Sequence, residues 1–210
     1  MNKVKIKEWI SQTFQEEKPL KKLRDQFLSA QPFEHLELYN FFNKTKIKEL
    51  LNGLRNEEYE EKDADLFSLL QTQDLNHSQQ PNIKEFTELI NSAEFLQIIN
   101  EITGIILKKG KTDCSSHIFR QYDYLLCHDD LVDSRKIAFV LNLSNKFTKN
   151  DGGALQLFCN KDGSPVKVAK SIVPIFNNFV IFKVSPISFH QVQEVYANKK
   201  RVTISGWFHE

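Results

Sequence analysis

The sequence predicts an α+β fold in which helices occupy the first half of the chain and a β-sandwich or barrel occupies the second half. Before Gly104, apolar residues recur at intervals of three to four, the spacing of amphipathic helices. After Gly104, apolar and polar residues alternate, as in half-buried strands. No helical pattern separates these strands, which favours a sandwich or barrel. The length of 210 residues fits a single domain.

Residues 1–104 are expected to be mainly helical and to support one sheet of the second half. The last helix is the best defined, because Ser92 is suited to the N-cap and Gly104 to a left-handed C-cap. A short extended piece is expected at residues 33–38. The acidic run 57–65 is interpreted as an exposed helix edge or loop, with a partner-binding patch as the alternative.

Residues 105–210 are expected to form five or six short strands separated by clusters of glycine, proline, asparagine and aspartate. The expected strands cover residues 117–127, 137–143, 154–158, 172–173, 179–184 and 201–208. The two parts together are expected to form one domain.

Composition argues against several classes of protein. With 28 basic and 27 acidic side chains, the chain lacks the basic surface typical of direct nucleic-acid binding. No apolar run reaches ~18 residues, so no membrane span is expected. The N-terminal segment 1–10 lacks the pattern of a secretory signal, and the 3 cysteines fit a reducing compartment. A cytoplasmic or nuclear location is therefore expected.

His128 and Asp130 are candidate metal ligands, because they follow a strand-like run in the segment LLCHDD. Residues i and i+2 of a strand project from the same face, so both could reach one ion while Asp129 points away. A strand-end histidine beside exposed carboxylates would explain this pair equally well. His190 is a third candidate, since it ends an apolar stretch consistent with a facing strand across a barrel mouth. Two histidines and one carboxylate leave coordination positions open, as in non-haem Fe(II) oxygenases.

The other four histidines are interpreted as surface or hydrogen-bonded residues: His35, His77, His117 and His209.

Arg201 begins the segment RVTISGWF, in which Arg201, Thr203 and Ser205 share one strand face. We expect this face to line the barrel interior. An interior arginine needs an anionic partner, because burying an unpaired guanidinium costs several kcal/mol. Its planar fork of donors is suited to binding a carboxylate.

The order H-x-D, distant H and R-x-T resembles the 2-oxoglutarate- and iron-dependent dioxygenases of the double-stranded β-helix fold, which is similar to jelly rolls and cupins. The match is closer to the eukaryotic prolyl 3-hydroxylases that modify a small-subunit ribosomal protein at the decoding centre. It is carried by segments across nearly the whole chain: QPFEHLELYNFFN, DADLFSLLQTQDL, LLCHDD, RKIAFVLNL, DGGALQLF, KSIVPIFNNFVIFKVSPISFHQVQEV and RVTISGWFH. The resemblance implies a double-stranded β-helix catalytic core at residues 105–210 and a protein substrate with a target proline.

The same resemblance implies that His128, Asp130 and His190 bind Fe(II). It also implies that Arg201 binds the distal carboxylate of 2-oxoglutarate, with a second hydrogen bond from Thr203. O2 would be the other cosubstrate and ascorbate the reductant.

Two positions depart from the family. Phe119 and Asn142 stand where the family generally has tyrosine. Asn142, Tyr122 and Tyr124 are therefore further candidates for holding 2-oxoglutarate, with a packing role as the alternative.

Three other functions stay open at this stage. The chain could be a 2-oxoglutarate oxygenase acting on another protein or a small molecule, a zinc or cupin-type metalloenzyme, or a non-catalytic iron-binding scaffold. A zinc or cupin-type metalloenzyme would give Arg201 no obvious role. The presence of all three metal ligands and of Arg201 argues against a non-catalytic scaffold. Members of the family carry a second, non-catalytic β-helix domain that is not expected in this chain. The sequence therefore predicts neither the oligomeric state nor how a substrate docks.

Overall fold

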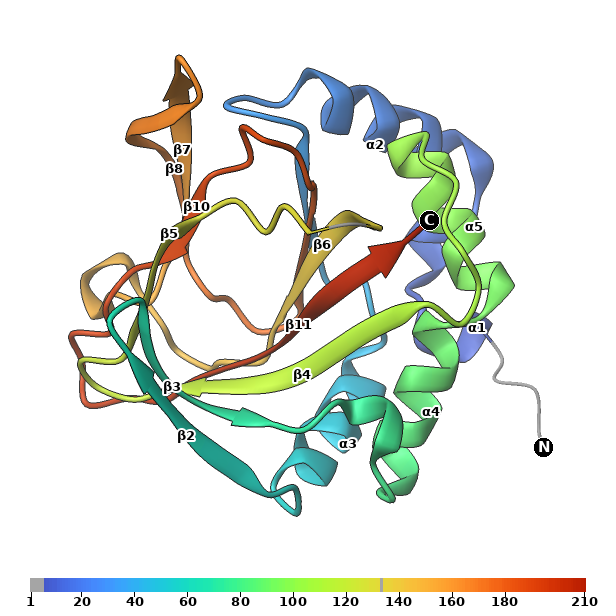
Figure 1. Cartoon of the computed structure of the whole chain (residues 1–210). Helices are drawn as coiled ribbons and strands as arrows, with labels where there is room; N and C mark the ends of the chain where they lie inside the picture. Colours follow the sequence, from blue (N-terminus) through green and yellow to red (C-terminus); the bar gives the residue numbers. More distant parts are fainter. Residues whose placement is uncertain (1–5, 133) are drawn as a thin grey trace.

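The computed structural model describes residues 6–132 and 134–210, and its centre is a curled antiparallel sheet with helices on one side (Figure 1). The described helices are α1 Ile6–Trp9, α2 Glu17–Ser29, α3 Lys44–Leu54, α4 Pro81–Ile90 and α5 Ala93–Thr103, with short 3-10 turns at Gln12–Phe14, Leu75–His77 and Lys149–Asp151. The described strands are β1 His35–Tyr39, β2 Tyr59–Ala64, β3 Phe67–Thr72, β4 Thr112–Phe119, β5 Tyr124–His128, β6 Arg135–Asn142, β7 Leu155–Lys161, β8 Ser164–Ile172, β9 Asn178–Lys183, β10 His190–Val192 and β11 Arg201–His209.

The strands follow the order β1-β9-β6-β11-β4-β3-β5-β10-β7-β8, and β2 pairs with β3. The sheet curls so that β5 and β10 lie opposite β11 and β4 (Figure 1). Helices and sheet together confirm the predicted α+β class. None of the described helices is long and apolar enough to cross a membrane. The expectation about a secretory signal rests partly on residues 1–5, which lie outside the described residues.

Alternation along β6 separates the two faces of the sheet. Ile137, Phe139 and Leu141 belong to the large core shared with the helices, whereas Ala138 and Val140 belong to a smaller cluster inside the curled sheet. This is the period of two expected when both faces of a strand are covered. The same strand therefore anchors the helices and forms a wall of the interior.

Phenylalanine side chains join the helices to the sheet. Phe179 of β9 stacks on Phe41 with ring centroids 5.4 Å apart and lies 5.2 Å from Phe42 and 6.4 Å from Phe95 of α5. All four rings are buried. Helix α5 is capped as expected, because the Ser92 side chain accepts a hydrogen bond from the Phe95 backbone N–H.

The first half of the chain contains more strand than expected. Residues 59–64, within the acidic run, form strand β2, so the expectation of a helix edge or loop was wrong. Strand β2 is an edge strand in which no described residue is fully buried, so it carries no alternating apolar signal. Its partner β3 is hydrogen-bonded to β4 and β5, and β1 is paired with β9. Strands from both halves thus share one sheet, and the division at residue 104 stays a prediction.

The expected strand 117–127 is two strands, since β4 ends at Phe119 and β5 begins at Tyr124. Asp123 holds the intervening turn by accepting hydrogen bonds from the Arg120 backbone N–H at 2.7 Å and guanidinium at 3.1 Å. Strand β8 starts at Ser164, well before the expected residue 172, because most of its side chains are exposed and carry little pattern.

We predict that Phe179→Ala lowers the free energy of unfolding by about 3–5 kcal/mol, because it leaves a cavity among four packed rings. Urea denaturation followed by circular dichroism measures the change. Leu28→Ala is the matched control, since Leu28 is 52% exposed and its truncation should cost well under 1 kcal/mol. Equal effects of the two substitutions would show that the ring cluster does not anchor the helices.

Candidate metal centre and cofactor cavity

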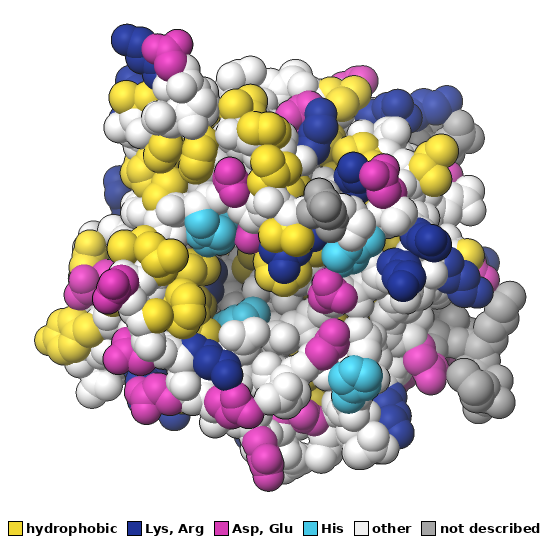
Figure 2. All heavy atoms as spheres, viewed as in Figure 1, with side chains coloured by type: hydrophobic (Ala, Val, Ile, Leu, Met, Phe, Trp, Pro, Cys, Tyr) yellow, Lys and Arg dark blue, Asp and Glu magenta, His cyan; other side chains and the backbone are white. Residues whose placement is uncertain are grey.

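A cavity of about 250 Å³ lies inside the curled sheet. The face seen in Figure 2 is hollowed near its centre, and histidine side chains lie close to the hollow. The wall is mostly apolar, and its residues come from eight strands and from the loop after β5: Phe67, Leu69, Gln71, His117, Phe119, Leu125, His128, Asp130, Ala138, Phe139, Val140, Leu155, Phe182, His190, Val192, Arg201, Thr203, Ser205, Gly206 and Trp207.

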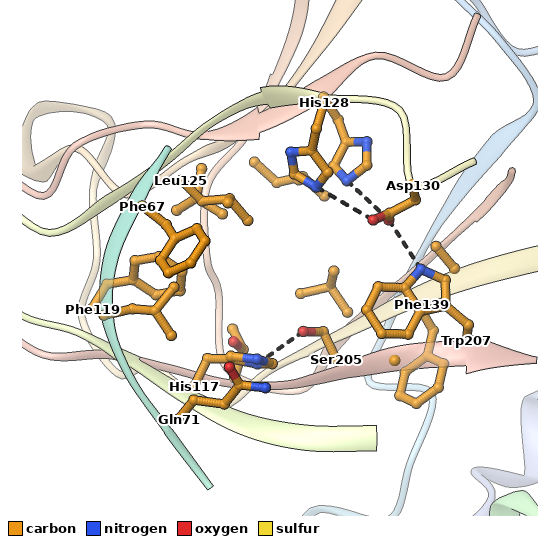
Figure 3. Close-up of a pocket in the computed structure, with 18 of the residues that line it drawn as sticks. Phe67, Gln71, His117, Phe119, Leu125, His128, Asp130, Phe139, Ser205 and Trp207 are labelled. Carbon is orange, nitrogen blue, oxygen red and sulfur yellow. Dashed lines mark hydrogen bonds and ion pairs between the residues drawn. The ribbon is translucent and has the colours of Figure 1, made fainter. Parts of the chain in front are cut away.

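The three predicted metal ligands come together at one wall of this cavity, where Figure 3 shows His128 and Asp130 side by side. Nε2 of His128 lies 3.4 Å from Oδ1 of Asp130, and Nε2 of His190 lies 3.3 Å from Oδ2. One ligand atom from each residue lies within 4.8 Å of the other two. The arrangement can therefore hold a metal ion.

The local backbone differs from the expected one at two of these residues. His190 lies on β10 directly beside β5, in register with His128, and not on a facing strand across the mouth. Asp130 follows the end of β5 with φ 62, so its approach to His128 comes from a left-handed residue and not from strand alternation. The Asp129 carboxylate instead accepts a hydrogen bond from the Leu131 backbone N–H at 3.0 Å.

Both imidazoles are oriented by backbone carbonyl groups. Nδ1 of His128 lies 2.8 Å from the Leu126 carbonyl oxygen, and Nδ1 of His190 lies 2.8 Å from that of Ser188. A carbonyl oxygen only accepts, so Nδ1 carries the proton and Nε2 keeps its lone pair. Metal-binding histidines are held in this way in many proteins.

The Asp130 carboxylate is buried and surrounded by donors. Burial alone would raise the pKa of Asp130, but hydrogen bonds from the protonated forms of His128 and His190 outweigh burial and hold the pKa well below its usual range. The Trp207 indole N–H donates to Oδ2 at 3.0 Å, and the Arg135 guanidinium stacks on the Trp207 ring at 3.5 Å. The carboxylate is therefore ionised and fixed in place, as a metal ligand must be.

Arg201 is buried in the cavity wall without a counter-ion. It is 1% exposed, and no salt bridge to it is found among the residues described. Its Nε has no hydrogen-bond partner there, the Thr203 hydroxyl lies 3.5 Å from a terminal nitrogen, and the Phe119 ring lies 5.0 Å from the guanidinium carbon. Burial lowers the pKa of Arg201 to about 9. An isolated buried cation favours an anionic ligand, so the expected role for Arg201 fits its surroundings.

The other candidates for holding a cosubstrate lie elsewhere. Tyr122 is 66% exposed, and Tyr124 lines a separate surface hollow with Tyr196. Asn142 is buried next to Thr203 in the β6–β11 register, but its amide donates to the Asn178 carbonyl oxygen at 3.2 Å and it does not line the cavity. The structure thus brings Thr203, and not these three, beside Arg201.

Sequence reasoning missed His117, Gln71 and Trp207, all of which line the cavity. His117 was expected to be a surface or hydrogen-bonded residue. Its Nδ1 does form a hydrogen bond with the Ser205 hydroxyl at 3.0 Å, but the ring lies inside the barrel. Burial and the nearby Arg201 charge lower the pKa of His117 to about 4. The period-two spacing places His117 and Phe119 on one face of β4, but only the register with β11, in which Phe119 pairs with Arg201, puts that face inside the barrel.

Residues 114–209 match the model of the 2OG-Fe(II) oxygenase superfamily. This region, which is similar to that superfamily, contains the three candidate metal ligands and Arg201. Oxygenases of the superfamily take Fe(II) and 2-oxoglutarate, the two cofactors that the sequence predicts.

Two relatives and one solved structure extend the comparison. The chain is 38% identical to the prolyl 3-hydroxylase OGFOD1 of Xenopus laevis and 35% identical to that of Mus musculus, in each case over 87% of this chain. It covers 36% and 34% of these relatives, so it spans about a third of their length. A Pseudomonas putida prolyl-4-hydroxylase superposes with a TM-score of 0.72 over 91% of this chain and 98% of its own, at 17% identity. This similarity confirms the predicted double-stranded β-helix fold.

We predict that stability falls as the pH drops from about 6.5 to 4, partly because of His117. In the unfolded chain this imidazole titrates near 6.5, whereas in the fold its pKa is about 4, so the unfolded state binds the extra proton in this range. The loss is on the order of 2–3 kcal/mol at most, from 1.36 kcal/mol per pKa unit. Urea titrations from pH 4 to pH 8 should show a shallower fall for His117→Gln than for the wild type. If the free energy of unfolding depends on pH in the same way in both proteins, His117 does not contribute to the loss of stability.

Proposed function

We propose that this chain is the catalytic part of a 2-oxoglutarate- and Fe(II)-dependent dioxygenase that hydroxylates a prolyl residue of a protein. The observation that carries the proposal is the placement of two histidines and a carboxylate in the same cavity as a buried, unpaired arginine. The first group suits Fe(II), and the second suits the far carboxylate of a dicarboxylic acid. Two relatives named as prolyl 3-hydroxylases support the reaction.

Under this proposal, His128, Asp130 and His190 hold Fe(II) through Nε2 and carboxylate oxygen atoms. Arg201 binds the distal carboxylate of 2-oxoglutarate, and the Thr203 hydroxyl assists it. The donor set fits, because both histidines present an unprotonated Nε2 and Asp130 is ionised. The orphaned Nε of Arg201 supports the anion site.

Iron with 2-oxoglutarate and O2 would supply the oxidation that inserts oxygen into a C–H bond, with succinate and carbon dioxide as the other products and ascorbate as the reductant. The protein supplies placement. Arg201 orients the cosubstrate from the wall opposite the metal ligands, and Trp207 keeps the Asp130 carboxylate from rotating. The apolar wall, with Phe67, Leu125 and Val140, excludes water from the reacting atoms.

The substrate we propose is the small-subunit ribosomal protein of the decoding centre. Support comes from the resemblance of nearly the whole chain to the prolyl 3-hydroxylases that modify this protein. The near-balanced charge of the chain favours a protein over a nucleic acid as the direct partner.

We predict that the purified protein, with Fe(II), 2-oxoglutarate and ascorbate, adds 16 Da to a peptide of about twenty residues that bears the target proline, because one oxygen atom is inserted. Mass spectrometry and succinate release measure the two products. Asp130→Ala should reduce both to background, whereas Asp129→Ala should retain most activity because its carboxylate points away.

The same peptide with alanine in place of proline should stay unmodified. Succinate release without any peptide oxidation would support the oxygenase activity but contradict the proposed substrate. Absence of both products from the wild type, with peptide and with the intact ribosomal protein, would contradict the proposed function.

We predict that Arg201→Lys weakens apparent 2-oxoglutarate affinity roughly ten- to a hundredfold, because it keeps the charge and loses the planar fork, at ~1.5–3 kcal/mol for a charge-assisted hydrogen bond. The maximal rate should change less. Succinate formation at increasing 2-oxoglutarate concentrations measures both quantities. An unchanged dependence on 2-oxoglutarate would assign Arg201 a structural role.

A further inference from the structure

A row of polar side chains crosses the wall opposite the metal ligands. Gln71 of β3 pairs with His117 of β4, and His117 pairs with Thr203 of β11. Directly paired residues of antiparallel strands project from the same face, and all three residues line the cavity. Figure 3 shows Gln71 and His117 across the cavity from His128 and Asp130. Arg201 lies two residues before Thr203 on the same face of β11, so its guanidinium adjoins this row.

His117 is held by one ring nitrogen and leaves the other available. Nδ1 lies 3.0 Å from the Ser205 hydroxyl, and no described group is hydrogen-bonded to Nε2. The hydroxyl of serine can rotate to donate, and Nε2 then carries the proton of the neutral ring. The pKa of about 4 keeps the ring neutral near pH 7. His117 is therefore a neutral N–H donor inside the cavity.

The surroundings of this donor are apolar, so an unpaired polar group there is unfavourable. Phe67, Leu69 and Phe119 line the same part of the wall. In such surroundings an unmade hydrogen bond costs about 1–3 kcal/mol in mutational series. The Nε of Arg201 is fully buried without a hydrogen-bond partner among the described residues. The Gln71 amide, which is half-buried, lines the cavity and is hydrogen-bonded to no described group. Three unpaired groups on one wall indicate that a ligand with several acceptor atoms belongs there.

A single carboxylate group can accept hydrogen bonds from the unpaired donors on this wall. It neutralises Arg201 and still has acceptor sites for neutral donors. A second cation next to Arg201 would be unfavourable in this interior, whereas a neutral imidazole adds a hydrogen bond without adding charge. A ligand with an apolar end would form no hydrogen bond with any of these three groups.

We propose that His117 donates a hydrogen bond from Nε2 to the distal carboxylate of 2-oxoglutarate, beside Arg201, and so helps to select 2-oxo acids that carry a second carboxylate. Ser205 is the positioning residue for the ring. Gln71 extends the row on the far side of His117. The inference rests on the proposed function, because it takes 2-oxoglutarate as the ligand of the cavity.

The test is calorimetric binding to Mn(II)-loaded protein, which needs no turnover. Two ligands are titrated, 2-oxoglutarate and 2-oxopentanoate, which has the same chain length and a methyl group in place of the distal carboxylate. His117→Phe should weaken 2-oxoglutarate binding by roughly tenfold, the effect of one hydrogen bond to a charged group. Binding of 2-oxopentanoate and of Mn(II) should not change. His117→Gln, which keeps an N–H donor, should recover part of the loss.

Two further variants complete the design. His77→Phe makes the same exchange at an exposed histidine and should bind both ligands like the wild type. Ser205→Ala keeps the His117 side chain but removes the hydroxyl that orients its ring. This variant should weaken 2-oxoglutarate binding by about two- to threefold. This variant carries the test if His117→Phe does not fold.

The inference is overturned if His117→Phe leaves 2-oxoglutarate binding unchanged, or weakens the binding of both ligands equally. In either case the proposed function would still be supported, provided that the wild type binds Mn(II) and 2-oxoglutarate. A wild-type protein that binds neither Mn(II) nor 2-oxoglutarate would overturn both.

Discussion

The hydrogen-bonded ladders on the two sides of strand β11 determine where the functional side chains lie. One ladder runs along β4 from Arg201 to Phe208, and the other joins the strand to β6 from Thr203 onward. A slip of one residue would move every side chain of the strand to the opposite face. Arg201 would then leave the cavity and Ile204 would leave the core. Gly206 protects this register, because a Cβ there would collide with the carbonyl oxygen of Asp113 on β4.

The sequence predicted those elements that have at least one buried face. Strands β6 and β9 are buried on both faces and appear as short continuous apolar runs, whereas β11 alternates between polar interior residues and apolar core residues. The ligand positions followed from local spacing and from the resemblance. Strand β2 was missed because water covers most of both faces, and an exposed strand needs no apolar pattern. The turn between β4 and β5 was missed because Asp123 holds it with hydrogen bonds that no periodicity reveals.

The missed site residues depend on pairing between strands that are far apart in the chain. His117 is distinguished from the other histidines only by its register with Gln71 and Thr203. Trp207 of β11 contacts Asp130 in the loop that follows β5, and the Arg135 that stacks on it begins β6. The spacing of residues along the sequence specifies which of them share a face of one strand. It does not specify which residue of another strand lies opposite.

The two faces of the sheet divide stability from function. On the interior face, Arg201 is buried without a counter-ion, which is unfavourable for folding in the absence of a ligand. On the opposite face of the same strands, Phe139, Phe179 and Phe208 pack with the rings of the helical half. Each buried aromatic side chain contributes several kcal/mol, so this face can offset the unfavourable burial of one arginine. An anion bound at Arg201 would remove that penalty, and its binding would therefore stabilise the curled sheet as well as complete the site.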